Sequence, residues 1–178
     1  MFKKKKKCVI WLTGLPCSGK STIAENLKQK IKRPTEILDG DVVRNSLCKD
    51  LGFSKEDRKT NLKRITFVAR MLSKHYIVTI CSFVSPYKNI RNKIREEIEN
   101  SGIEFVEVSV YALLSTCEKR DVKGMYKLAR EGKIKEFTGV GAPYEYANNP
   151  EVKVLTDAET IEESTNKILK YLKKKDII

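Results

Sequence analysis

The sequence predicts a three-layer α/β fold, in which a mainly parallel β-sheet carries helices on both of its faces. Short apolar runs typical of buried strands alternate with longer segments in which apolar residues recur every three or four positions, as on one face of a helix. The 178 residues suit a single core, and no internal repeat divides them. We therefore expect residues 1–178 to form one domain.

The first half of the chain contains two strand–helix pairs. Residues 8–12 are short and apolar, which predicts a buried strand, and residues 20–31 follow with the apolar spacing of a helix. The second pair is a short strand at residues 36–38 and a long helix at residues 54–74. The long helix begins with Ser-x-x-Asp, which resembles a capping box.

The second half continues the alternation. A strand at residues 76–81 is followed by Ser-Pro, and a helix at residues 87–100 ends at Ser-Gly, a common helix terminus. The other expected elements are strands at residues 104–110 and 153–155 and helices at residues 113–120 and 160–173. Because strands and helices alternate throughout, we expect the strands to run parallel.

Two segments lie outside this alternation. Residues 1–7 form a basic leader. Residues 121–150 contain several glycines and prolines among many charged residues and have no long apolar face. Since the pattern of strand and helix resumes after residue 150, we interpret residues 121–150 as a mobile lid rather than as a linker.

The composition is that of a globular domain, with 40% hydrophobic and 33% charged residues. No apolar run approaches the roughly 20 residues that a membrane helix needs, and we see no secretory signal pattern. The five cysteines include no C-x-x-C pair of the kind that binds metals or exchanges disulfides. We expect a cytoplasmic protein with no membrane partner.

The net charge of +13 has three interpretations. The charge could serve a nucleic-acid or anionic-membrane partner. It could instead come from solvated lysine runs near the two ends of the chain, or line a pocket for highly anionic small molecules. A surface for single-stranded nucleic acid would interleave aromatic residues with the lysines. Only Phe2 and Tyr171 lie beside the lysine runs, so we expect no nucleic-acid partner.

The most specific short motif is G-x-x-x-x-G-K-S, which follows the first expected strand and opens the first expected helix. In this pattern backbone N–H groups surround the phosphates of a nucleoside triphosphate. Lys20 is placed to reach the β- and γ-phosphates, and the Ser21 hydroxyl is placed to bind Mg²⁺. The residues predicted to bind the ATP cofactor here are Gly14, Leu15, Pro16, Cys17, Ser18, Gly19, Lys20, Ser21 and Thr22.

Other sequence patterns, present or absent beside this motif, narrow the class of nucleotide-binding enzyme. The base-reading N-K-x-D pattern of GTPases is absent, and the strand at residues 76–81 lacks the acidic pair expected of a helicase-type ATPase. Small-molecule kinases with this loop often place their key acid at the end of the second strand, where Asp39 and Asp41 stand. In an extended segment these two side chains would point the same way, so one could accept the proton of a hydroxyl or hold Mg²⁺. The competing interpretation is a helix cap.

Basic residues beyond the acid pair predict an anionic acceptor. Arg44 lies three residues after Asp41, and Arg58 and Asn61 share one face at the start of the long helix. Guanidinium groups match the oxygens of phosphate and sulfate.

Five motifs occur in an order that matches one family: DGDVVR (39–44), GFSKEDRKTNLKR (52–64), FVSPY (83–87), CEKRDVKGMYKLAREGKIKEFTGV (117–140) and APYE (142–145). From about residue 7 to residue 172 the chain resembles the adenylyl-sulfate kinases, enzymes of the P-loop kinase fold. The resemblance implies that ATP phosphorylates the 3′-hydroxyl of adenosine 5′-phosphosulfate (APS), giving ADP and 3′-phosphoadenylyl sulfate (PAPS) in sulfate activation. Related kinases act on other nucleotide conjugates, such as cytidine diphosphoramidate, which remains the alternative.

The resemblance also implies roles for particular residues. Arg44, Arg58 and Asn61 would hold the phosphosulfate, and Phe53 and Phe137 would sandwich its adenine. Lys123 would close with the lid over both nucleotides, and Arg120 would lie beside the donor adenine. The expected substrate-binding set is Asp39, Asp41, Arg44, Phe53, Arg58, Asn61, Val84, Ser85, Lys123 and Phe137. The expected catalytic set is Lys20, Asp41 and Ser85, and the expected Mg²⁺ ligands are Ser21 and Asp41.

Ser85 has two interpretations. The family is often described with a phosphoserine intermediate at this position, whereas a Ser-Pro turn has a purely structural use. His75 is the only histidine and lies at the other end of the adjoining strand, so no histidine is near in sequence to activate Ser85. We favour direct in-line transfer, which needs only positioning and charge neutralisation.

The chain departs from the family pattern at two places. Pro16 and Cys17 stand where small residues are expected, and Val140-Gly141-Ala142 lacks an acidic pair. Neither change touches the expected chemistry. We expect ATP and adenylyl sulfate as the small-molecule partners, and a homodimer.

Overall fold

The computed structural model describes residues 6–178, so the first five residues of the expected basic leader lie outside it. The elements, in chain order, are β1 (Cys8–Thr13), α1 (Lys20–Lys30), β2 (Thr35–Asp39), α2 (Gly40–Arg44), α3 (Lys55–Lys74), β3 (Val78–Ser82), α4 (Lys88–Glu99), β4 (Glu104–Tyr111), α5 (Leu114–Arg120), α6 (Met125–Arg130), β5 (Val152–Leu155) and α7 (Ile161–Lys174).

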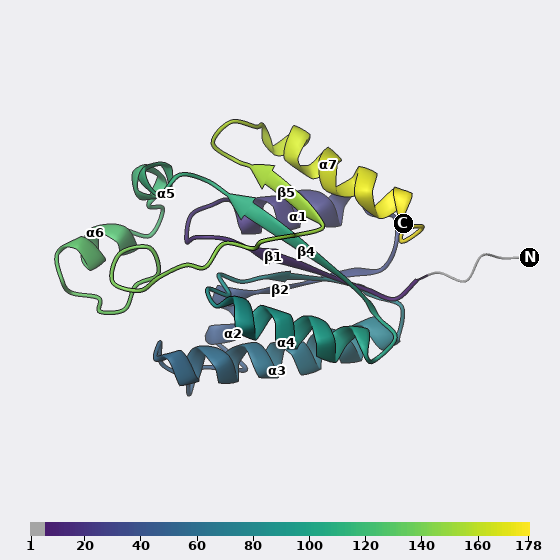
Figure 1. The fold of residues 1–178 in the computed structure, drawn as a ribbon, viewed down its shortest axis with the longest axis horizontal. Coiled ribbons are helices and arrows are strands. Elements are labelled where there is room, and N and C mark those ends of the chain that lie inside the picture. The colour runs from purple at the N-terminus through teal and green to yellow at the C-terminus, as the bar shows by residue number, and fades with distance from the viewer. Residues whose placement is uncertain (1–5) are drawn as a thin grey trace, which may run out of the picture.

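The five strands form one sheet in the order β2-β3-β1-β4-β5, and every neighbouring pair is parallel. Helices α1 and α7 cover one face, and α3 and α4 cover the other (Figure 1). The predicted three-layer α/β fold is therefore confirmed.

Central strand β1 is buried from end to end, as a strand with helices on both faces must be. Its side chains alternate between two cores. Ile10 and Leu12 pack toward α1 and α7, whereas Val9 and Trp11 pack toward α3 and α4. The alternation follows from the twofold period of a strand.

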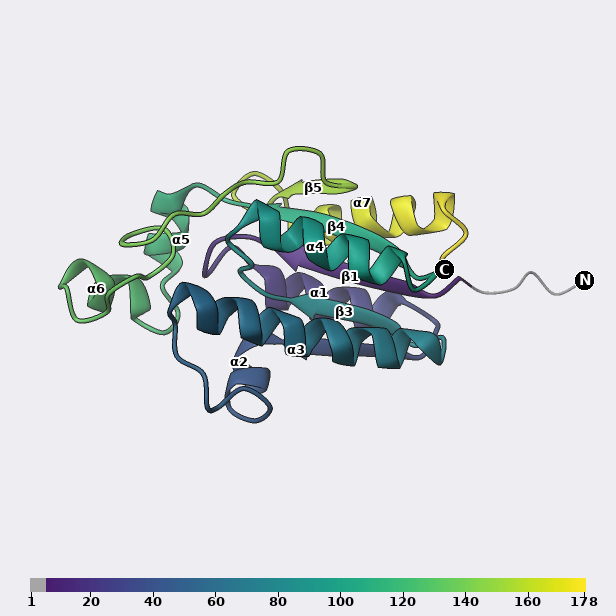
Figure 2. The ribbon, with the colours of Figure 1, turned by 60° about the horizontal axis from the view of Figure 1, so that its bottom comes forward.

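The lid segment lies beyond the carboxyl ends of the strands. Figures 1 and 2 both show α5, α6 and the following loop projecting past this edge of the sheet. In parallel α/β sheets this edge is where ligands bind. The topology therefore places the phosphate loop (residues 14–22), the end of β2 and the lid (residues 121–150) around one region.

Local chemistry explains three differences from the predicted elements. The expected strand at residues 76–81 begins two residues later, because α3 ends at Lys74 and Tyr76 adopts a left-handed φ of 63° in the turn. The segment after Asp39 is helix α2 rather than extended chain, so the geometry assumed for the acid pair was wrong. Helix α6 within the lid was not predicted, since its six residues are too short for a clear apolar period.

The two ends of the described chain meet at the opposite edge of the sheet. Arg33 donates hydrogen bonds to the carbonyls of Lys6, Tyr76 and Ile177. One guanidinium thereby joins the residues before β1 to those after α7. Within residues 6–178, no helix combines the length and apolar character needed to cross a membrane.

Candidate active site

The phosphate loop has the conformation that its sequence predicts. Gly19 takes a left-handed φ of 94° immediately before α1. A Cβ on Gly14 would lie 2.3 Å from the Val110 carbonyl oxygen, so only glycine fits against β4 at that position. Ser18 is fully buried, and its Oγ has no hydrogen-bond partner among the described residues. The loop therefore presents a buried polar group toward the start of a helix, where phosphates bind.

Lys20 is buried within this loop. Its ammonium group donates to the carbonyl oxygens of Gly14 (3.1 Å) and Leu15 (2.7 Å). Burial lowers the pKa of Lys20 to about 8, against nearby acidic groups that raise it. A phosphate group at this position would offset that loss of solvation, because an anion favours the charged form of lysine.

Two residues from later in the chain contact the phosphate loop: Arg120 at the end of α5 and Thr156 just after β5. Arg120 donates to the Cys17 carbonyl (3.4 Å) and to the backbone and side-chain oxygens of Thr156 (2.5 and 3.2 Å). The Thr156 hydroxyl also lies 2.7 Å from the Ser18 carbonyl. The structure thus places Arg120 beside the phosphate loop, and its expected position beside the donor adenine stays a prediction. Thr156 was missed, although its position just after a parallel strand could have indicated it.

The acid pair is divided between two tasks. Asp39 accepts a hydrogen bond from the Ser21 hydroxyl (2.7 Å) through Oδ2, and its Oδ1 caps α2 by accepting from the Asp41 backbone N–H (3.0 Å). Asp41 lies on the first turn of α2, and its carboxylate pairs with Lys123 of the lid. The cap interpretation therefore holds for Asp39, because the helix begins one residue after it.

The Ser21–Asp39 contact brings together a hydroxyl and a carboxylate, both oxygen ligands that suit Mg²⁺. Ser21 and Asp41 are the Mg²⁺ ligands that the sequence predicts. Asp41 instead pairs with Lys123, whereas Asp39 contacts Ser21 directly, so Asp39 is the better candidate for the second Mg²⁺ ligand. Among the described residues no group of three or more His, Cys, Asp or Glu side chains forms a metal cluster. The donors here are thus few, as is usual for Mg²⁺ sites completed by phosphates and water.

Phe53 presents an exposed ring beside two arginines. It is 56% exposed, and the Arg44 guanidinium carbon lies 4.3 Å from its ring centroid. Arg44 also donates to the Gly52 carbonyl at 2.8 Å. Burial lowers the pKa of Arg44, and the nearby positive charge of Arg58 lowers it further. Two guanidinium groups that repel each other form a site that an anion would stabilise.

Arg58 links the two segments that carry the predicted aromatic pair. It donates to the Phe53 carbonyl (2.7 Å), the Glu136 carbonyl (2.6 Å) and the Thr138 hydroxyl (2.8 Å). The last two residues flank Phe137 in the lid. Arg58 therefore fixes the backbone on both sides of the expected adenine site.

Phe137 is less isolated than expected. The polar sequence around Phe137 suggests the assumption that the ring has little core to join, but the ring packs edge-on against Tyr126 of α6, with centroids 5.0 Å apart. Both belong to a small apolar cluster that includes Leu15 and Cys117. That assumption was wrong because α6 supplies the missing partner, although stacking on the other face of Phe137 remains a prediction.

Asn61 lies in the first half of α3, as predicted. It is 5% exposed, and its Oδ1 has no hydrogen-bond partner among residues 6–178. A buried polar atom without a partner in a binding region indicates a place for a ligand or a water molecule. Asn61 is thus available to the predicted acceptor.

Ser85 lies in the turn after β3 with a left-handed φ of 45°. The side chain is buried, and its Oγ accepts a hydrogen bond from the Trp11 indole N–H at 3.0 Å. Within residues 6–178, no imidazole or carboxylate is hydrogen-bonded to this hydroxyl. A donor bound to Oγ does not activate it as a nucleophile, which favours the structural interpretation of Ser85.

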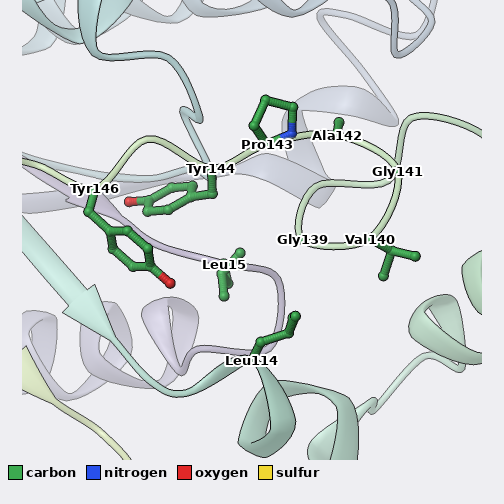
Figure 3. Close-up of a pocket in the computed structure, with 9 residues that line it drawn as sticks. All are labelled: Leu15, Leu114, Gly139, Val140, Gly141, Ala142, Pro143, Tyr144 and Tyr146. Carbon is green, nitrogen blue, oxygen red and sulfur yellow. The ribbon is translucent and has the colours of Figure 1, made fainter.

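An apolar pocket of about 440 Å³ lies under the lid beside the phosphate loop. Figure 3 shows Leu15, Leu114, Val140, Tyr144 and Tyr146 around it, and the remaining lining residues are Gly139, Gly141, Ala142 and Pro143. No charged side chain lines the pocket, so it does not resemble a phosphate site. Of the predicted site residues only Leu15 contributes to it.

The comparison with protein families decides the relationship. A model of the adenylylsulphate kinase family matches residues 6–155. The chain belongs to the adenylylsulphate kinase family. It is therefore a kinase, and its ATP-binding loop is the one described above.

Similar proteins agree with this membership of the adenylylsulphate kinases. The adenylyl-sulfate kinase of Gloeothece citriformis is 53% identical over 172 residues, covering 95% of this chain and 96% of that protein. The adenylyl-sulfate kinase of Saccharomyces cerevisiae is 46% identical over 180 residues, covering 99% and 89%. The APS kinase of Mycobacterium tuberculosis, solved in complex with AMPPNP and APS, superimposes with a TM-score of 0.92 at 35% identity, covering 95% of this chain and 99% of that one.

One departure from the adenylylsulphate kinase pattern, Cys17, places a non-glycine residue in a strained backbone conformation. Cys17 holds a left-handed φ of 59°, a conformation in which glycine is favoured. Its side chain packs partly buried against the cluster of Leu15 and Cys117, and its carbonyl accepts from Arg120. The packing partly offsets the backbone strain, so the loop keeps its shape without a glycine.

Proposed function

We propose that this chain transfers the γ-phosphoryl group of ATP to the 3′-hydroxyl of adenylyl sulfate, releasing ADP and PAPS. Family membership supports the reaction class. The observation that carries the assignment to these residues is the placement of three groups at the carboxyl ends of the strands: Lys20 in the phosphate loop, Asp41 on the first turn of α2, and the arginine pair Arg44 and Arg58.

On the donor side, Lys20 contributes a positive charge where charge develops on the transferring phosphoryl group. We propose Ser21 and Asp39 as the protein groups that hold Mg²⁺, directly or through water. The ion, when bound, neutralises phosphate charge and aligns the β- and γ-phosphates. Arg120 and Thr156 keep the loop in position by their contacts with Cys17 and Ser18.

On the acceptor side, Asp41 is the group we assign to the 3′-hydroxyl, whose proton its carboxylate accepts as the O–P bond forms. Lys123 contacts this carboxylate from the lid and so ties Asp41 to the segment that we propose closes over the acceptor. Arg44, Arg58 and Asn61 are assigned to the phosphosulfate, while Phe53 and Phe137 hold the adenine. Val84 and Ser85 border the acceptor as parts of the turn after β3.

Closure of the lid excludes water, which would otherwise accept the phosphoryl group and hydrolyse ATP. We propose direct in-line transfer, since the Ser85 hydroxyl is buried and held by Trp11. We also propose a homodimer; one similar structure is described as a hexameric APS kinase from Thiobacillus denitrificans, so the assembly is best measured by sedimentation velocity.

The test is release of ADP in a coupled assay with ATP and Mg²⁺, comparing adenylyl sulfate, cytidine diphosphoramidate and no acceptor. We expect the highest kcat/KM with adenylyl sulfate, with PAPS detected as the product. Faster turnover of the cytidine conjugate would replace this assignment with a related kinase activity. Turnover that is independent of any acceptor would contradict both.

A further inference from the structure

A buried arginine outside the predicted site joins the acceptor region to the lid. Arg91 lies on α4 and is 2% exposed. Its Nε donates to the Glu107 carboxylate of β4 at 2.8 Å, which balances its charge in the interior. Its two remaining nitrogens reach two segments that are far apart in the sequence.

The first segment is the turn after β3, residues 84–87, which we call the acceptor turn. Arg91 Nη1 donates to the Ser85 carbonyl at 2.6 Å. The Thr13 hydroxyl, at the end of β1, lies 2.8 Å from the Val84 carbonyl. Two buried donors thus hold the backbone of the turn that borders the proposed acceptor site.

The second segment is the returning arm of the lid at residues 144–145, which we call the lid return. Arg91 Nη2 donates to the Glu145 carbonyl at 2.7 Å, and the Arg91 guanidinium lies 5.8 Å from the centre of the Tyr144 ring. The Tyr144 hydroxyl is 2.8 Å from the Thr13 hydroxyl. Arg91 and Thr13 therefore each contact both the lid return and the acceptor turn.

Direct contacts complete the junction. The Glu145 backbone N–H donates to the Pro86 carbonyl at 2.8 Å, and the Glu145 carboxylate accepts from the Lys88 N–H at 2.7 Å, at the start of α4. The acceptor turn and the lid return are thus joined by backbone, side-chain and helix-cap contacts around one guanidinium.

We infer that Arg91 is a positioning residue for phosphoryl transfer, which fixes the acceptor turn and the lid return as one unit. The inference rests on the proposed function, because it assumes that the turn borders the acceptor. In this arrangement the lid return cannot move without the acceptor turn. A substitution at Arg91 should therefore lower kcat/KM for the acceptor more than kcat/KM for ATP.

The chain offers a closely matched control. Arg95 lies one helical turn further along α4 and also approaches Glu107 (3.5 Å), but its other partners are Glu99 and Glu151. Its guanidinium also lies 4.7 Å from the centre of the Phe105 ring. Arg95 contacts neither the acceptor turn nor the lid return in the part of the chain that the structure describes. Arg95→Lys therefore disturbs the same ion-pair cluster without touching the junction.

The experiment compares Arg91→Lys with Arg95→Lys for kcat and for the KM of each substrate, with thermal unfolding measured in parallel. We expect Arg91→Lys to lower kcat/KM for adenylyl sulfate about tenfold or more, the scale of losing hydrogen bonds from a charged group, with KM for ATP nearly unchanged. Arg95→Lys should leave both near wild type. Equal losses in the two variants, or an equal loss for ATP and acceptor, would overturn the inference.

Two further measurements keep the test decisive. If Arg91→Lys does not fold, Tyr144→Phe is the substitute, because it removes only the hydroxyl that contacts Thr13. Tyr146→Phe is its control. We expect the KM for the acceptor to rise in Tyr144→Phe and not in Tyr146→Phe, and equal KM values in the two variants would overturn the inference. Limited trypsin cleavage needs no acceptor, so it separates this inference from the proposed function. Faster cleavage within residues 121–150 of ligand-free Arg91→Lys supports the junction even if adenylyl sulfate is not the substrate, and unchanged cleavage contradicts it.

Discussion

The phosphate loop takes its shape mainly from contacts within a few residues, whereas the acceptor side is assembled from segments about eighty residues apart. Lys20 bonds carbonyls five and six residues before it, and Ser18 N–H bonds the Leu15 carbonyl. Arg58, by contrast, bonds residues 78 and 80 positions away. The donor half is therefore largely a local structure, braced from outside by Arg120 and Thr156, whereas the acceptor half is completed only when the lid is in place.

This difference separates two kinds of functional failure. On the proposed function, damage to the phosphate loop should remove catalysis itself, because its groups are the ones we assign to the transferring phosphoryl group. Damage to the contacts between α3 and the lid changes how well the acceptor is held. Mutations in the two halves should therefore differ in which kinetic parameter they change.

The largest effect is expected at Lys20. Lys20→Ala removes the buried positive charge of the donor half, and we expect no measurable turnover from a folded protein, a loss of at least about 10³-fold in kcat. Lys28→Ala, an exposed lysine of the same helix paired with Glu36, is the control. Turnover near the wild-type rate in Lys20→Ala would show that the loop is not the donor site.

Asp41 lies where the two halves meet. Asp41→Asn should lower kcat by about 10²–10⁴-fold, the usual cost of losing a general base, while ATP binding changes little. It should also release Lys123, because the ion pair across the lid is lost. The measurements are steady-state kinetics and ATP titration, with Asp50→Asn as the control. A change confined to the acceptor KM would assign Asp41 to binding.

Phe137 tests the acceptor half alone. Phe137→Ala should weaken adenylyl sulfate by roughly 1–3 kcal/mol, the scale of one base–aromatic stack, and affect ATP far less. Because the ring also packs on Tyr126, Phe137→Leu is needed to retain part of that contact. Phe67→Ala, an exposed phenylalanine on α3, is the control. A variant whose ATP KM rises while its acceptor KM is unchanged would reverse the assignment of the two halves.

Ser85 should give the smallest effect. Ser85→Ala removes one hydrogen bond, from the Trp11 indole, and we expect activity within about tenfold of wild type. Mass spectrometry of the wild-type enzyme during turnover should detect no phosphoserine. Complete loss of activity together with a trapped phosphoserine would establish a two-step transfer instead.

The same contrast explains what the sequence could predict. The phosphate loop was read correctly down to its glycines, since a local motif determines its conformation. The strands and long helices followed from apolar spacing. Helix α2 could not be predicted because its five residues carry no apolar period, so the extended geometry assumed for the segment after Asp39 was wrong.

The acceptor half was predicted as a set of residues but not as an arrangement. No pattern in the sequence could show that Arg58 bonds both sides of Phe137, or that Tyr126 packs against that ring, because these contacts join distant segments. Arg91 escaped notice for a related reason: among the many arginines of this basic chain, only burial distinguishes it.

The contacts of Arg33 have a consequence for engineering this protein. Since one guanidinium bonds the carbonyls of both Lys6 and Ile177, the two ends of the described chain are neighbours, on the far side of the sheet from the lid. A short linker could therefore connect them, and new termini could be opened in a surface loop elsewhere. A reporter attached at either end of the described chain would lie away from the carboxyl ends of the strands, where we propose the nucleotides bind.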